Sequence, residues 1–237
     1  MTEHGPASLS VDQFAELAGH VVRHIPRDIP PERAQFFVQN GEELERALRN
    51  GLMPEPDVAE LLRAWEEFYL AIFKRQVDFS GVAVPAHQAG FDRLIVVAGG
   101  LTPNVAFHAC HDQFQTWSYY DDLDKAIVAN DRELTKNYAV WVRDRVEADE
   151  ELKNLSASQL KERNIQGVTL LERFLYELKF HAETGDHLDK RMTTICSGSR
   201  YLGGGVPYVY WHDGGLCVYG DHPDFRSGGL RSRQAVS

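Results

Sequence analysis

Two short runs of alternating residues near the C-terminal end constrain the fold most. The runs are VPYVYW and LCVYG, and they flank the sequence HDGG at residues 212–215. Such residues tolerate the positive φ angles of a tight turn, so the segment predicts a β-hairpin. Because side chains alternate across a strand, the hairpin has two different faces. One face carries the core set Val209, Trp211, Leu216 and Val218, and the other carries Tyr208, Tyr210, Cys217 and Tyr219.

The tyrosine-bearing face has two interpretations. Tyrosine is a good strand former, so this face could pack under other elements of the fold. Alternatively it is an exposed aromatic and polar surface, which would be an uncommon amount of aromatic surface for a monomer without a partner. The alternation pattern alone supports both interpretations equally.

The first 85 residues carry helical patterns. Ser10 and Gln13 form a capping box ahead of an apolar stripe that stops before Pro26. A second helix is predicted from the Pro30-Pro31 pair, a third in EELERALRN up to Gly51, and a fourth over residues 56–76. We expect these helices to pack against one another. The aperiodic stretch VDFSGVAVPAHQAGFD then predicts a domain boundary near residue 85.

Residues 86–237 mix strand and helix patterns. The apolar run DRLIVVAGG and the segment YAVWVRD are typical of strands, while PNVAFHACHDQF, SASQLKERN and TLLERFLYELKFHAETG are typical of helices. With the C-terminal hairpin, these elements predict an α+β fold. It consists of an N-terminal helical region, residues 1–85, and a mixed domain, residues 86–237, with a C-terminal antiparallel sheet.

Charge and cysteine content narrow the function classes. The 237 residues carry a formal net charge of −10, which disfavours a nucleic-acid partner, and RSGGLRSR is the one basic stretch that stands out. No apolar run approaches the roughly 18 residues that span a bilayer, and the start MTEHGPASLS lacks signal-peptide character. Three widely spaced cysteines do not suggest a disulfide framework. We therefore expect a cytoplasmic protein without a membrane or nucleic-acid partner.

The tail uses a different set of amino acids from the rest of the chain. Residues 193–233 contain no Lys, Glu, Gln or Met, although the rest of the chain uses these residues freely. The same segment holds nine of the 19 glycines and several tyrosines. Tyrosine offers a large contact area at low entropy cost, while Gly, Ser and Asp bend and form hydrogen bonds. This composition is typical of an adaptable binding surface.

HPDFRSGGLRSR, which follows the Gly/Tyr/Asp/His-rich stretch, resembles the ends of variable proteins diversified by retroelements. CSGSRY and the two segments YAVWVRDRVEADEELKNLSASQLKERN and TLLERFLYELKFHAETGDHLD are similar to uncharacterised multi-copy bacterial proteins of that type. The resemblance covers roughly residues 101–237. It implies a C-type-lectin-like domain in which an error-prone reverse transcriptase rewrites adenines of a C-terminal cassette, here about residues 200–233.

The resemblance also accounts for the residues that the tail lacks. Codons of the form AA-pyrimidine can be rewritten to Tyr, Asp, His, Gly or Cys, but never to Lys, Glu, Gln, Met or Trp. Trp211 is then a fixed position, in agreement with its predicted place on the core face. The resemblance implies a ligand-binding surface for a protein or other macromolecule and no cofactor. The candidate contact residues are Leu202, Tyr208, Tyr210, His212, Asp213, Cys217, Tyr219, Asp221, His222 and Phe225.

Other residue patterns compete with this hypothesis. His108 and His111 share a helical face but Cys110 does not, so a metal site there needs a distant partner, and we expect none. Cys196 beside SGSRY, or Cys110, could serve a hydrolase or thiol enzyme with a histidine base, but a buried, inert cysteine is the simpler interpretation. The GGG at 203–205 lacks the Lys-Ser/Thr of a phosphate loop. A third possibility is an assembly protein whose tyrosine face contacts another copy, so an oligomer stays open.

Overall fold

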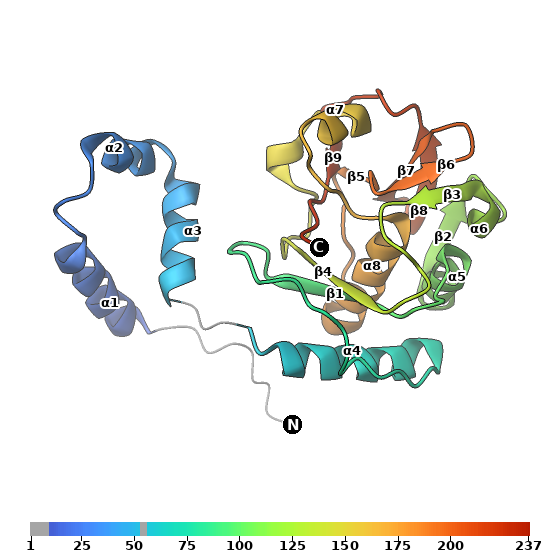
Figure 1. The fold of residues 1–237 in the computed structure, drawn as a ribbon, viewed down its shortest axis with the longest axis horizontal. Coiled ribbons are helices and arrows are strands. Elements are labelled where there is room, and N and C mark those ends of the chain that lie inside the picture. Colours follow the sequence, from blue (N-terminus) through green and yellow to red (C-terminus); the bar gives the residue numbers. More distant parts are fainter. Residues whose placement is uncertain (1–9, 53–55) are drawn as a thin grey trace. The chain divides into compact units, whose positions relative to one another are not determined.

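The computed structural model describes residues 10–52 and 56–237 (Figure 1). The chain divides between Gly51 and Leu52 into two compact units. No helix in the described ranges has the length and apolar character needed to cross a membrane. The strands found in the described residues, including the predicted hairpin, all lie in the second unit, so the candidate site belongs to it.

The described part of the first unit, from residue 10 on, contains three helices. They are α1 (Val11–His24), α2 (Pro31–Gln39) and α3 (Gly41–Leu52). The predicted capping box is confirmed, because the Ser10 hydroxyl accepts from the backbone N–H of Gln13 and the Gln13 side chain accepts from the Ser10 N–H. The Pro30-Pro31 pair starts α2 as expected, since proline suits the first helical turn. The prediction that Gly51 ends the third helix is wrong, because α3 continues to Leu52.

Helix α4 (Val58–Phe73) belongs to the second unit. Trp65 Nε1 donates to the carbonyl of Leu94 at 3.1 Å, and the Tyr69 hydroxyl donates to the carbonyl of Val96 at 3.0 Å. Both acceptors lie in β1 (Arg93–Val97), along which α4 runs. The apolar stripe of this helix therefore covers a strand, and the expectation that it packs with the earlier helices is wrong. By packing, the chain divides before α4 rather than near residue 85.

Removal of residues 1–51 is expected to leave the second unit folded. Neither α1 nor α2 has a buried residue, whereas residues 52–237 enclose their own apolar core. Because the residues that form this core in the described part of the chain all follow residue 57, we expect the free energy of unfolding to change by less than about 1 kcal/mol. Thermal and denaturant unfolding of the 52–237 fragment, measured beside the full chain, checks this. A fragment that loses cooperative unfolding would contradict it.

Three sheets form the strand part of the second unit. The antiparallel pair of β1 with β4 (Tyr138–Val142) lies against α4 and α8, and β3 (Ile127–Asn130) pairs antiparallel with β6 (Ser199–Tyr201). The third sheet has five strands in the order β2-β8-β7-β5-β9. Its strands are β2 (Gln115–Ser118), β5 (Thr193–Ile195), β7 (Val206–His212), β8 (Gly215–Asp221) and β9 (Leu230–Ser232).

The remaining helices of this unit are α5, α6, α7 and α8. Their bounds, with the short 3-10 helix η1, are α5 (Pro103–Gln113), α6 (Leu123–Ala126), η1 (Glu150–Leu152), α7 (Ala157–Glu162) and α8 (Leu170–Thr184). The predicted α+β fold is confirmed. The five-stranded sheet is mixed, however, because β2 pairs parallel with β8 and β9 pairs parallel with β5.

The C-terminal hairpin is present as predicted. Strands β7 and β8 pair antiparallel, with Val209 opposite Val218 and Tyr210 opposite Cys217. Asp213 and Gly214 in the turn both have positive φ, 48° and 78°. These angles are what a two-residue turn of type I′ requires, and its twist matches that of the flanking strands. The hairpin register is thereby fixed, and with it the set of side chains on each face.

Candidate functional site

The inner face of the hairpin packs on the core. Val209, Leu216 and Val218 are fully buried, as predicted. Trp211 packs against the core on the predicted face but is only half-buried, so the prediction that it is buried holds only in part. Its ring stacks on His187, with centroids 3.4 Å apart, and meets the Phe114 ring edge-on at 5.6 Å. Phe114 directly follows α5 and His187 lies just after α8. Trp211 therefore joins the hairpin to the ends of these two helices.

The outer face carries a cluster of four aromatic rings, which we call the aromatic platform: Trp117, Tyr208, Tyr210 and Tyr219. Ring centroids are 4.4 Å apart for Trp117 and Tyr219, and 5.8 Å apart for Tyr208 and Tyr219. Tyr210 lies 6.0 Å from Tyr219 and 6.2 Å from Tyr208. The three tyrosines are half-buried, because each ring shields its neighbours. The interpretation of this face as an exposed aromatic surface therefore holds only in part.

Trp117 is the member that the sequence analysis missed. It lies on β2, which pairs in parallel with β8 of the hairpin. In this register Trp117 lies opposite Cys217. Its side chain is 45% exposed, so the ring offers a free face to solvent. No element was predicted over the segment QTWSYY. Its alternation of Trp117 and Tyr119 with Thr116 and Ser118 is the signal of a strand that could have revealed it.

Both interpretations of the outer face apply, each to a different part of the sheet. Above β5 and β9 lies a second apolar core made by η1, α7 and the strands: Leu152, Ala157, Leu160, Ile195, Val206 and Leu230. Tyr208 packs at the margin of this core. Over β7, β8 and β2, no described element buries the rings, as the half-exposed tyrosines and Trp117 indicate. The outer face is therefore covered at one end and open at the other.

The loops beside the platform carry the polar candidates. His212 and Asp213 are exposed in the hairpin turn, with 3.3 Å between His212 Nε2 and the Asp213 carboxylate. Asp221 ends β8, and one of its oxygens accepts from the backbone N–H of His222 at 2.7 Å. His222 and Phe225 are exposed in the loop that follows. The structure therefore places these predicted residues at the two ends of the platform.

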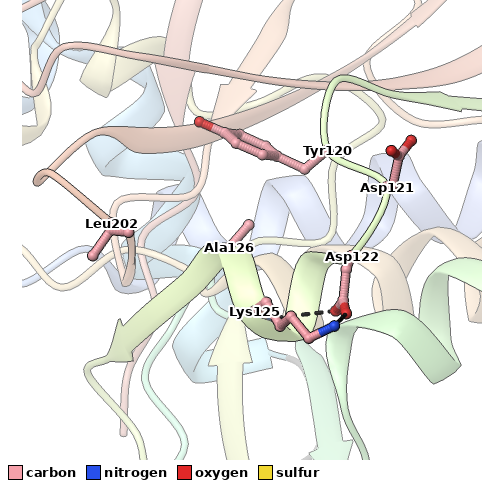
Figure 2. A pocket seen from close by; sticks show the side chains of 6 residues that line it. All are labelled: Tyr120, Asp121, Asp122, Lys125, Ala126 and Leu202. Atoms are coloured by element: carbon pink, nitrogen blue, oxygen red, sulfur yellow. Dashed lines mark hydrogen bonds and ion pairs between the residues drawn. The ribbon is translucent and has the colours of Figure 1, made fainter.

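Leu202 lies apart from these loops, at a hollow of about 370 Å³ (Figure 2). The hollow is lined by Tyr120, Asp121, Asp122, Lys125, Ala126 and Leu202. Lys125 pairs with Asp122 at 2.8 Å, while the Asp121 carboxylate is turned away from this pair. Leu202 is 80% exposed, as expected of a contact residue. The Tyr201 hydroxyl donates to the carbonyl of Tyr219, which connects this edge to the platform strand.

Three groups on the outer face have raised pKa values, namely Tyr208, Tyr210 and Cys217. Burial, together with Cys217 and Tyr219, raises the pKa of Tyr210 to about 12. Burial, with the charge of Asp221, raises the pKa of Tyr208. Burial, with the charge of Asp213, also raises the pKa of the Cys217 thiol. Tyr208, Tyr210 and Cys217 therefore lose their protons less readily than free tyrosine and cysteine, and they lie between Asp213 and Asp221 along the hairpin.

The two remaining cysteines lie in the core. Burial is the main cause that raises the pKa of both Cys110 and Cys196, and both side chains are fully buried. No hydrogen bond joins a cysteine to a histidine in the described ranges. Within the same ranges, no three His, Cys, Asp or Glu side chains are grouped as a metal would need. A neutral buried thiol is a poor nucleophile, so the thiol-enzyme alternative gains no support from this geometry.

Thiol labelling is expected to separate the three cysteines. Cys217 is half-buried on the outer face, whereas Cys110 and Cys196 have no exposed surface. In the native protein we expect a maleimide to modify Cys217 slowly, because its raised pKa leaves little thiolate, and to leave the other two intact. Peptide mass mapping after labelling measures this, with labelling in denaturant as the control. Rapid native modification of Cys196 would contradict the structure.

A buried ionic network lies beneath the sheet. Asp189 accepts from Arg173 Nε at 3.0 Å, from Arg233 at 2.7 Å and from the Thr194 hydroxyl at 2.6 Å. Arg173 also binds Glu177 at 2.8 Å, and Glu177 lies 2.9 Å from His187 Nδ1. His187 in turn stacks on Trp211. The network therefore connects α8, β5 and the C-terminal residues to the inner face of the hairpin.

The basic stretch RSGGLRSR is largely internal. Arg233 is 1% exposed and bonds Asp189 and two backbone carbonyls. Arg231 is buried beside Glu150 and donates to the carbonyl of Ala148 at 3.2 Å. Arg226 alone of the three is exposed. Arg231 and Arg233 therefore stabilise the C-terminal part of the fold, and the stretch does not form a basic surface.

No family model matches the chain, and no match was found among curated proteins or solved structures. The resemblance to retroelement-diversified variable proteins, and the C-type-lectin-like fold that it implies, therefore stay predictions. The functional argument rests on the geometry of the platform and its loops.

Proposed function

We propose that the protein is a ligand-binding protein that recognises a protein or other macromolecule through the aromatic platform and its flanking loops. The observation that carries the proposal is the uncovered ring cluster of Trp117, Tyr208, Tyr210 and Tyr219 on an otherwise well-packed sheet. Tyrosine and tryptophan are the residues in which binding energy concentrates, at roughly 1 to 4 kcal/mol for each anchor. The proposed activity is recognition and needs no cofactor.

The construction of the sheet supports this role. The buried side chains of β7 and β8 fix the strand register, and the network around Asp189 holds the sheet from below. Substitutions on the outer face would then alter the surface without altering the fold. A rigid scaffold with an exchangeable surface is what a diversified binding protein requires. Free rather than disulfide-bonded cysteines accord with our placement of the protein in the cytoplasm.

Deep sequencing of the 3′ end of the gene across a bacterial population tests the proposal. We expect amino-acid changes to concentrate at outer-face and loop positions of residues 200–233, namely Leu202, Tyr208, Tyr210, His212, Asp213, Cys217, Tyr219, Asp221, His222 and Phe225. The inner-face positions Val209, Trp211, Leu216 and Val218 serve as matched controls within the same strands, and should stay constant. A reverse transcriptase gene with a near-identical template copy should lie nearby.

Trp117 provides a second control. It belongs to the platform but lies outside the proposed cassette, so we expect it to stay constant although its side chain is exposed. If sequence variation depended on surface exposure alone, Trp117 would vary together with Tyr210. Changes spread evenly over both faces, or no change at all together with no template copy, would overturn diversification of this surface.

A further inference from the structure

We propose that the aromatic platform binds a cationic side chain, so that the partner is a protein that presents a basic, arginine-bearing peptide segment. This inference rests on the proposed binding function and adds the chemistry of the ligand. Three features of the platform carry it: the ring faces, the carboxylates at its ends, and the residue content of its strands.

The rings present the surface that a cation prefers. The face of an aromatic ring carries partial negative charge, and a guanidinium within about 6 Å of a ring centroid is attracted to it. The rings of Tyr208 and Tyr219 are almost parallel, at 9°, and those of Trp117 and Tyr219 lie 31° apart. With centroids 5.8 and 4.4 Å apart, these rings stack on one another, and Trp117, which is 45% exposed, leaves a ring face open to solvent at the end of the stack. A planar guanidinium stacks on such a face, which favours arginine over lysine.

Carboxylates stand at both ends of the ring cluster. Asp213 is in the hairpin turn, close enough to Cys217 to raise the pKa of its thiol. Asp221 ends β8, and its charge in the same way acts on Tyr208. With a rise of about 3.3 Å per residue, strand β8 separates these ends by roughly 20 Å. An extended peptide of about six residues therefore covers the platform and reaches both carboxylates.

The strands of the open part supply no competing cation. Strands β2, β7 and β8 read QTWS, VPYVYWH and GLCVYGD, without a single Lys or Arg. Asp221 at the end of β8 and Asp213 in the turn therefore have no Lys or Arg partner on these strands. Asp221 accepts from the backbone N–H of His222, and Asp213 lies 3.3 Å from His212 Nε2. The net charge of −10 adds long-range attraction for a basic partner. An acidic or neutral partner would gain the ring contacts but not this attraction.

The test is isothermal titration of the full chain with three hexapeptides of matched length, one arginine-rich, one glutamate-rich and one made of Gly and Ser. Quenching of tryptophan fluorescence provides an independent signal, since Trp117 is the most exposed of the four tryptophans, Trp211 is half-buried on the inner face, and Trp65 and Trp141 are buried. We expect the arginine peptide to bind at least tenfold more tightly than either of the others. Tyr210→Ser should weaken its binding about two- to fivefold, the fold-change that corresponds to one exposed cation–π contact.

Two comparisons make the result specific. Tyr210→Phe keeps the ring and should lose less affinity than Tyr210→Ser. Asp221→Asn should weaken arginine-peptide binding more than Glu133→Gln does, although both variants change the net charge equally. Glu133 is exposed and pairs with Lys136, in the segment between β3 and β4. Circular dichroism of each variant confirms that the comparison is made between folded proteins.

The inference is overturned if the three peptides bind equally or not at all, or if Asp221→Asn and Glu133→Gln behave alike. It is also overturned if the platform proves to be a contact between two copies of the chain that excludes the peptide, as sedimentation would show. Failure of the inference is distinguishable from failure of the proposed function. Population sequencing that finds variation confined to the outer face, with no preference for the arginine peptide, would retain the function and reject the cationic ligand.

Discussion

Replacement of Asp189 by Asn is expected to lower the free energy of unfolding by about 3 to 5 kcal/mol, as for removal of one partner from a buried ion pair. Asp189 has no exposed surface, and its carboxylate pairs with the buried guanidinium groups of Arg173 and Arg233. Asparagine keeps the size of the side chain and tolerates the positive φ of 56° at this position. The loss would therefore report the missing charge rather than backbone strain.

The same site predicts how stability depends on pH. Burial alone would raise the pKa of Asp189, but Arg233 and Arg173 outweigh it and hold the pKa below its usual range. Because the folded-state pKa is the lower one, the stabilisation is complete above the unfolded pKa of about 4 and is lost as pH falls through the folded value. Denaturant unfolding of wild type and Asp189→Asn between acidic and neutral pH should therefore converge at the acidic end.

Asp186→Asn is the control for this experiment. Asp186 is exposed, pairs with Lys190 at 2.7 Å, and accepts from the backbone N–H of His187, which an asparagine oxygen also does. We expect little change in stability, because an exposed ion pair contributes little. Equal losses at Asp186 and Asp189 would mean that the network around Asp189 does not stabilise the fold as the structure indicates.

Local patterns in the sequence predicted the elements that are stabilised locally. The capping box at Ser10, the turn at Asp213-Gly214 and the helix over TLLERFLYELKFHAETG were each predicted from residues close together in the sequence, and each is present. The apolar side of α8 was predicted as well. Its polar residues Glu172, Arg173 and Glu177, however, are also buried. Helical periodicity could not show this, because their partners come from distant segments.

Elements formed by pairing between distant segments were missed. Strand β2 is four residues long and pairs in parallel with β8, about a hundred positions later in the chain, so no turn signal announces it. Trp117 was lost from the candidate site for this reason. The domain boundary failed similarly, because the apolar stripe of α4 shows that the helix packs on something without showing that β1 is the partner. Pattern predicts which face is buried but does not identify what covers it.

Trp211→Ala is expected to cost about 2 to 4 kcal/mol of unfolding free energy, somewhat less than a fully buried tryptophan because the ring is half-buried. The substitution removes the stack on His187 and the edge contact with Phe114, which join the hairpin to the layer beneath it. Tyr210 is the neighbouring residue on the opposite face, and Tyr210→Ser should cost about 1 kcal/mol or less, since the ring packs mainly against other platform rings.

This pair of adjacent substitutions tests the central physical claim, that one face of the hairpin holds the fold while the other is free for recognition. Urea unfolding of Trp211→Ala and Tyr210→Ser measures both losses, and His212→Ser in the exposed turn adds a further surface control. When binding of the arginine peptide by folded protein is measured instead of stability, Tyr210→Ser should have the larger effect. Tyr210→Ser should weaken binding of the arginine peptide in a folded protein, whereas Trp211→Ala should act through loss of folded protein. Equal destabilisation at the two positions would mean that the platform rings hold the fold, and a face that holds the fold cannot also be exchanged freely.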